Sequence, residues 1–91
     1  MMSQTKSLIF GVVKDPNGNP VSNARVSFTV GPVPLPDIAA LTDTMGSFTL
    51  SAPAPGEYVI EVVSDEFVKK REKINVENNQ EKHLEIALSR S

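Results

Sequence analysis

Acid–base and nucleophilic chemistry has few candidate residues in this 91-residue chain, which contains one histidine and no cysteine. The histidine, His83, stands between charged and polar neighbours in an alternating run, so we expect a solvated side chain on the outward face of a strand. A general base needs a positioned partner and a cleft, and the run offers neither. A serine nucleophile would depend on the same His83 for its activation. The sequence therefore predicts that the protein is not an enzyme.

Calcium binding is the second kind of chemistry that the spacing of residues suggests. Asp15, Asn17 and Asn19 stand at the first, third and fifth positions of the pattern for such a loop. Pro20 replaces the glycine of the sixth position, and Val26 replaces the bidentate glutamate of the twelfth. We therefore expect Asp15 to accept hydrogen bonds from turn amides, and we expect neither a metal nor a cofactor.

A basic run at residues 69–73 raises the question of nucleic-acid binding. Alternation along a strand would send its side chains to both faces of a sheet, and Glu72 interrupts the run. The net charge of −2 and the pI near 5.3 give no general attraction to nucleic acid or to anionic membranes. We expect a solubilising edge strand instead, because charge on an edge discourages pairing between sheets.

Targeting and membrane segments are the next features to consider. The apolar run near the N-terminus covers six residues, 8–13 counted with Gly11. A secretory signal needs an apolar stretch of about 7–15 residues with a cleavage site after it, and a membrane span needs about 20 residues. We therefore expect no membrane partner and a cytoplasmic location, unless the protein travels with a larger exported assembly.

The elements that hold these residues are predicted by alternation of period two, since no helical period persists for more than about a turn. Each run puts its apolar side chains on one face, as a half-buried strand requires. The inward residues expected, strand by strand, are Ile9, Gly11 and Val13; Ala24, Val26, Phe28 and Val30; Phe48 and Leu50; Tyr58, Ile60 and Val62; Ile74 and Val76; and Leu84, Ile86 and Leu88. About seven short strands, about 8–12 residues apart, predict an all-β antiparallel sandwich or barrel.

Turn-forming residues separate the runs. In "DPNGNP", residues 15–20, proline presets φ and Gly18 is able to adopt a positive φ. In "DTMG", residues 43–46, aspartate at the first position and glycine at the fourth favour a type I turn. The prolines of "APAPG", residues 52–56, lack N–H donors and so interrupt a ladder.

Residues 31–41, "GPVPLPDIAAL", form the longest irregular segment and contain three prolines. Prolines favour an extended path and deny ladder hydrogen bonds. One interpretation is a crossover that packs Val33, Leu35 and Ile38 over an open end of the core. The other is a stiff binding loop, because binding residues concentrate on loops held by a rigid scaffold.

Three stretches, "GVVKDPNGNPVSNARVSF", "TDTMGSFTL" and "PGEYVIEVVSDEF", together resemble the carboxypeptidase regulatory-like domain, a transthyretin-like β-sandwich. The positions that carry the resemblance are Gly11, Asp15, Gly18, Pro20, Val21, Ala24, Val26, Thr42, Asp43, Gly46, Phe48, Pro55, Gly56 and Tyr58. The resemblance implies an antiparallel, seven-stranded Greek-key β-sandwich over residues 8–89, preceded by a flexible N-terminal tail at 1–7. It also implies a module that acts without catalysis, while a fold shared by many functions identifies no partner.

Apolar residues also alternate onto the outward faces of two runs. Phe10 and Val12 lie on the outward face of the first strand, and Val59 and Val63 lie on that of the fifth. If these two strands approach each other, the four side chains form an exposed apolar strip, and such patches often mark protein contacts. Alternatively, residues 31–41 or the N-terminal tail cover the strip.

Protein–protein contact is the function that these features favour, either as self-association or as docking of a small accessory subunit on a larger assembly. The expected contact residues are Phe10, Val12, Val59 and Val63, with Val33, Leu35 and Ile38 as the second choice. The alternative is a carbohydrate- or small-ligand-binding module. Sugar binding has little support in the sequence, because the chain has no tryptophan and its one tyrosine falls on a core face.

Overall fold

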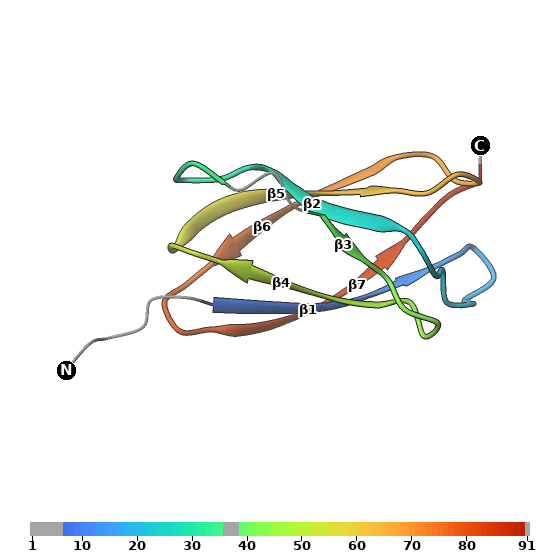
Figure 1. Cartoon of the computed structure of the whole chain (residues 1–91), viewed down its shortest axis with the longest axis horizontal. Helices are drawn as coiled ribbons and strands as arrows, with labels where there is room; N and C mark the ends of the chain where they lie inside the picture. The colour runs from blue at the N-terminus through green and yellow to red at the C-terminus, as the bar shows by residue number, and fades with distance from the viewer. Residues whose placement is uncertain (1–6, 36–38, 91) are drawn as a thin grey trace.

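Seven β-strands make up the secondary structure of the protein in a computed structural model that describes residues 7–35 and 39–90 (Figure 1). The strands are β1 (Ser7–Lys14), β2 (Arg25–Val30), β3 (Ala40–Leu41), β4 (Ser47–Ala52), β5 (Gly56–Val63), β6 (Lys70–Val76) and β7 (Glu81–Ala87). Within the described residues no helix is long and apolar enough to span a bilayer. Of the tail expected at residues 1–7, residues 1–6 lie outside the described part, and Ser7 belongs to β1.

The strands form two sheets packed face to face, so the predicted all-β sandwich is confirmed. Sheet A has the order β4-β1-β7, and sheet B has the order β3-β2-β5-β6. Strands β3 and β4 contact each other, and the short segment that joins them passes from one sheet to the other along one side of the sandwich. Strands β6 and β7 are therefore the edges on the opposite side. Residues 70–73 of the basic run belong to an edge strand, as expected, because in the described part of the chain β6 pairs with β5 alone.

Two details of strand pairing differ from the prediction. Strand β1 pairs with β7 in parallel, so sheet A is mixed rather than antiparallel; the first and last strands enter this sheet from the same end. In sheet B, a bulge between Phe28 and Val30 shifts the register against β5. Because of this extra residue Val30 pairs with Val59 and is 57% exposed, so its assignment to the inward face was wrong. The Greek-key connectivity stays a prediction.

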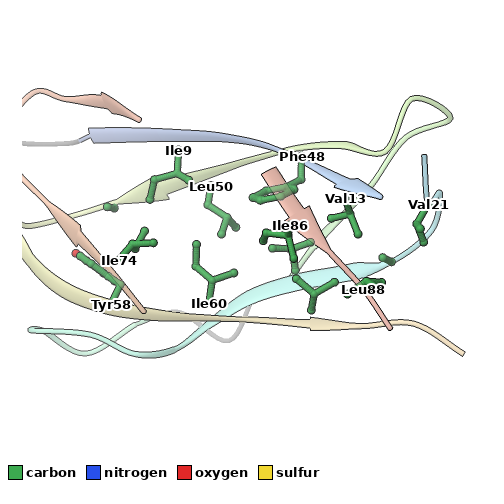
Figure 2. Close-up of a cluster of buried hydrophobic side chains, with 14 of the residues drawn as sticks. Ile9, Val13, Val21, Phe48, Leu50, Tyr58, Ile60, Ile74, Ile86 and Leu88 are labelled. Atoms are coloured by element: carbon green, nitrogen blue, oxygen red, sulfur yellow. The ribbon is translucent and has the colours of Figure 1, made fainter. Parts of the chain in front are cut away.

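One apolar core lies between the sheets and takes side chains from both (Figure 2). Figure 2 shows Ile9, Phe48 and Leu50 of sheet A facing Tyr58 and Ile60 of sheet B. The tyrosine is fully buried, and its hydroxyl donates a hydrogen bond to the carbonyl oxygen of Ala54 (2.6 Å). Because the side-chain hydroxyl finds this partner, the large ring is buried without an unsatisfied polar atom.

Gly11 packs closely against an aromatic ring of the neighbouring strand in sheet A. It pairs with Phe48 across β1 and β4, and the aromatic ring lies where a β-carbon on Gly11 would be. The glycine of the alternating run therefore belongs on the inward face, as predicted, because its missing side chain makes room for the ring.

The two glycine turns have the same geometry. In each, the aspartate Oδ1 accepts hydrogen bonds from the backbone N–H groups two and four residues later, at 2.9 Å, and its carbonyl accepts from the glycine N–H. The glycines adopt φ of +85° at Gly18 and +76° at Gly46. Asp15 thus accepts hydrogen bonds from turn amides, as the sequence predicts.

A buried threonine fixes these turns to each other. The Thr42 hydroxyl donates to the carbonyl oxygen of Val21 (2.7 Å) and accepts from the N–H of Ala24 (2.9 Å). This joins the segment after the first turn to the residue before the second one. A buried hydroxyl with both partners present adds specificity to the local path of the chain.

Candidate functional site

The outer face of sheet A is the first candidate surface. Its central strand, β1, places Leu8, Phe10 and Val12 on this face, and we call these three residues the outer apolar row. Each of them is partly exposed, whereas their neighbours along the strand are buried. Alternation in a strand with one face on the core produces this pattern. The sequence expectation for Phe10 and Val12 as outward residues is met in the geometry, and their role in contact stays a prediction.

Phe10 is covered on one side by the histidine. In the parallel pairing of β1 and β7, Phe10 lies opposite His83, and the two rings stack with centroids 5.3 Å apart at 23°. His83 is exposed, as the sequence predicts. The contact gives this histidine a packing role on the outer surface, and a general base would instead need a partner and a cleft.

Polar residues border the outer apolar row along both neighbouring strands. Strand β4 presents hydroxyls next to the row, and strand β7 presents carboxylates; the flanking residues are Ser47, Thr49, Ser51, Glu81 and Glu85. Lys14 Nζ lies 2.7 Å from the Glu85 carboxylate across this face. An apolar centre with a polar border resembles the anatomy of protein interfaces.

A shallow depression of about 300 Å³ lies over the middle of this face. Phe10, Val12, Thr49 and His83 are among the residues that line it. Gly11 of β1 is also among the lining residues.

The other two predicted contact residues, Val59 and Val63, lie on the opposite side of the molecule. They belong to β5 in sheet B, and β1 belongs to sheet A, so the single apolar strip expected from these strands does not form. Alternation gives the outward side chains of a strand but not the sheet to which the strand belongs, so the sequence left open whether these two strands approach each other. Val59 is partly exposed, and Val63 is 37% exposed.

Two further apolar residues, Leu41 and Val30, extend the outer face of sheet B and were missed in the sequence. Leu41 and Val63 both pair with Arg25, one on each side, and Leu41 is 61% exposed. Leu41 follows a proline-rich segment without alternation, so no periodic signal marked it. Val30 reaches this face only because of the bulge.

Charged side chains dominate the rest of this second face. The four cations are Arg25, Lys69, Arg71 and Lys73, and the two carboxylates are Glu57 and Glu61. Glu61 has 16% side-chain exposure and accepts from Arg71 Nε at 3.0 Å, with Lys69 Nζ at 3.9 Å. The outer face of sheet B thus has an excess of positive charge, with Lys73 opposite Val59.

The loop residues of the second choice fall in different places. Leu35 packs against the core, in contact with the end that holds Tyr58: a β-carbon on Gly31 would lie 3.0 Å from both side chains. Val33 is 37% exposed, and Ile38 lies outside the described residues. The described part of the loop therefore covers an end of the core, and it does not reach the depression around Phe10.

A polar groove of about 370 Å³ lies at the end formed by the first turn and the loop after β5. Here Arg90 lies 5.1 Å from the centre of the Phe67 ring and 3.7 Å from Asp15 Oδ2. The hydrogen bond from the Asn19 N–H, together with that from Asn17 and the nearby Arg90 charge, lowers the pKa of Asp15 from its ordinary 3.8. Within residues 7–35 and 39–90 no cluster of three metal-ligating side chains occurs.

The aromatic side chains bear on the alternative of sugar binding. Phe48 and Tyr58 are buried, and Phe28 packs on the tyrosine ring at 4.6 Å. Phe67 lies under Arg90 and Phe10 lies against His83, so both rings have one face already occupied. Carbohydrate binding stays a prediction.

Comparison with known proteins gives a family. A family model described as "Carboxypeptidase regulatory-like domain" matches residues 8–89. A comparison with curated protein sequences finds no match.

Solved structures resemble the fold at low sequence identity. BcpA, the major pilin subunit of Bacillus cereus, superimposes with a TM-score of 0.75 at 13% identity, over 91% of this chain and 28% of that chain. A cohesin–X-dockerin complex from Acetivibrio cellulolyticus gives 0.69 at 14% identity, over 90% and 56%. Hydroxyquinol 1,2-dioxygenase from Pseudomonas putida gives 0.74 at 10% identity, over 100% and 58%. This chain therefore spans little more than half of these chains at most, and the likeness at such identities concerns the fold alone.

Proposed function

Because the chain belongs to the carboxypeptidase regulatory-like domain family, we propose that it is a non-catalytic interaction module. In this proposal it makes protein–protein contact as a small accessory subunit of a larger assembly. The contact surface is the outer face of sheet A, with Phe10 and Val12 at its centre. The cytoplasmic location expected from the sequence stays a prediction.

The outer apolar row is the observation that carries the proposal. Leu8, Phe10 and Val12 follow one another on the central strand of a sheet whose outer face has nothing packed on it in the described chain. Full burial of one such side chain is worth about 1.5–3 kcal/mol, and these three are already partly covered. A partner that covered them would therefore gain part of that free energy at each residue, together with shape selection by the depression next to Phe10.

The absence of a catalytic role is supported by the environment of His83. Its ring stacks on Phe10 at the surface, in the lining of the open depression described above and between Glu81 and Glu85 along β7, whereas a general base needs a positioned partner and an enclosing cleft. Structures that share the fold include a pilin subunit and a cohesin–dockerin complex, which favours an assembly role, and also a dioxygenase. The fold is thus compatible with both classes, and the surface of this chain favours contact.

Affinity capture with three versions of the protein as bait tests the proposal. The baits are the wild type, Phe10→Lys, and Asn78→Lys, which adds the same charge to an exposed turn between β6 and β7. We expect proteins captured by the wild type and by Asn78→Lys to fall by tenfold or more with Phe10→Lys, since a charge would be buried without a partner. Capture is quantified against beads that lack bait.

Thermal unfolding of all three baits accompanies the capture. Phe10 is partly exposed, so the lysine variant is expected to unfold within a few degrees of the wild type. Equal capture by Phe10→Lys and Asn78→Lys, with both folded, would refute the assignment of the contact to this face.

A further inference from the structure

The two outer faces of the sandwich differ in charge. On sheet A the outer face has Glu81 and Glu85 along β7, and Lys14, the one lysine that the described residues place there, lies 2.7 Å from Glu85. On sheet B four cations face two carboxylates, and Lys73 has no carboxylate opposite it in the pairing with β5. Each face also presents apolar side chains on an inner strand, Phe10 on one and Val59 on the other. The faces are complementary in charge and similar in their apolar content.

We call Glu81 and Glu85 of β7 the acidic column, and Lys69, Arg71 and Lys73 at β6 the basic column. Both columns lie along the same side of the sandwich. Strands β3 and β4 share one side, so β6 and β7 are the edges of the other. A second copy that is shifted perpendicular to the sheets, without rotation, brings its sheet B onto sheet A of the first. In that arrangement the basic column of β6 lies over the acidic column of β7. Opposite charges then meet, and the apolar centres of the two faces lie over each other.

From this arrangement we propose that the partner of the outer face of sheet A is the outer face of sheet B in a second copy of the chain. The inference rests on the proposed function, since it names the occupant of the same contact surface. The contact joins two different faces on opposite sides of the molecule, so it is heterologous and adds copies in an open stack. Electrostatic complementarity sets the orientation, and the apolar centres supply most of the stabilisation.

The contact area sets the affinity that should be measured. Three strands spaced about 4.8 Å apart, with about 3.3 Å per residue, give a face on the order of 350 Å² for each copy. Stable complexes bury about 800 Å² for each partner, so this contact is weak. Association is therefore expected between about 0.1 and 1 mM protein, where a small interface dissociates reversibly.

Charge reversal on one face at a time tests the inference. Variant one, Glu81→Lys/Glu85→Lys, makes sheet A basic, and variant two, Lys73→Glu/Asn75→Glu, makes sheet B acidic. All four positions are exposed, so both variants should keep the wild-type unfolding temperature within a few degrees. Sedimentation velocity of the wild type should show association that weakens as salt is raised, because the charges are screened.

Each variant alone should associate at least tenfold more weakly than the wild type, and an equimolar mixture of the two should associate again. The mixture restores opposite charges on both kinds of contact. If the contact were instead between two copies of sheet A, variant two would associate like the wild type, and this result would overturn the inference.

A wild type that remains monomeric at about 1 mM and low salt would also overturn it. That result leaves the proposed function intact if Phe10→Lys still loses the proteins captured by the wild type. A monomeric wild type, together with equal capture by the wild type and by Phe10→Lys, would refute both the inference and the proposed function.

Discussion

Asp15 shows how one residue that looks like a ligand is used to build a turn. Oδ1 of its carboxylate accepts hydrogen bonds from two backbone N–H groups at 2.9 Å, so this oxygen already has the partners that a bound cation would have to replace. Arg90 approaches the other oxygen from the end of the chain at 3.7 Å. The same side chain thus orders a local turn and links it to the C-terminal segment. Charged hydrogen bonds of this type hold a carboxyl group in its ionised form.

The lowered pKa of Asp15 predicts a pH dependence of stability. A carboxyl whose pKa lies below 3.8 in the folded state contributes stability that is complete above pH 3.8 and disappears as the pH falls through the lower, folded value. Asp15→Asn keeps an acceptor oxygen and removes the charge. We expect it to lower the unfolding temperature at about pH 7 and to lower it by less at about pH 2, where part of the stabilisation by the charge is lost in the wild type as well.

Circular dichroism at the two pH values measures this difference, with Asp65→Asn as the control that removes one charge from an exposed turn. The same decrease in unfolding temperature at both pH values would show that the charge of Asp15 contributes nothing.

At the scale of the elements, the two glycine turns place the strands that they join. Both turns have an aspartate, a glycine three residues later and a positive φ at that glycine. They differ in their surroundings. A β-carbon on Gly18 would meet no atom within 4 Å, whereas one on Gly46 would lie 2.5 Å from the carbonyl oxygen of Val13. The second turn packs against β1. A glycine is therefore favoured at position 46 both because φ is positive and because there is no room for a side chain.

Substitution of each of the two glycines by alanine separates the cost of the positive φ from the cost of the missing space. Gly18→Ala should cost about 1–2 kcal/mol of unfolding free energy, the strain of a left-handed conformation. Gly46→Ala has the same strain and displaces backbone as well, so we expect a loss larger by about 1–3 kcal/mol. Urea unfolding of the two variants and the wild type gives both values. Equal losses would mean that the contact with Val13 relaxes without cost.

At the scale of the whole molecule, a single core joins the sheets. Side chains from both sheets interdigitate in it, and the described chain has no second cluster of buried apolar residues. Neither sheet would keep a buried apolar layer if the other sheet unfolded, because the buried side chains of each sheet pack against those of the other. A domain of this size without disulfides depends on that one interface for its stability.

Unfolding is therefore expected to be a single cooperative transition. Tyr58 is the only tyrosine, the chain has no tryptophan, and the ring is fully buried in the core between the sheets, so its fluorescence reports the contact between them. Far-ultraviolet circular dichroism reports the strands. The two urea curves should coincide. A fluorescence change at clearly lower urea than the loss of strand signal would indicate that the sheets separate first.

The alternation of apolar residues and the turn signals determined the fold class, the turns and most of the core. These features are local: a side chain two residues along a strand points to the same face, and a positive φ favours glycine wherever the turn occurs. The inward side chains of β1, β4, β5, β6 and β7 followed from this rule. So did the outward positions of Phe10 and Val12, whereas the edge character of the basic strand followed from its charge.

Which strands lie in the same sheet was decided only by the tertiary structure. Pairing between β1 and β7 joins residues more than 70 positions apart, and no local pattern specifies a parallel partner over such a distance. The bulge that turns Val30 outward depends on how β2 meets β5, which β2 alone does not reveal. The apolar residues of β1 and β5 consequently lie on opposite surfaces. Outward direction is a property of a strand, and the face it helps to form is a property of the sheet.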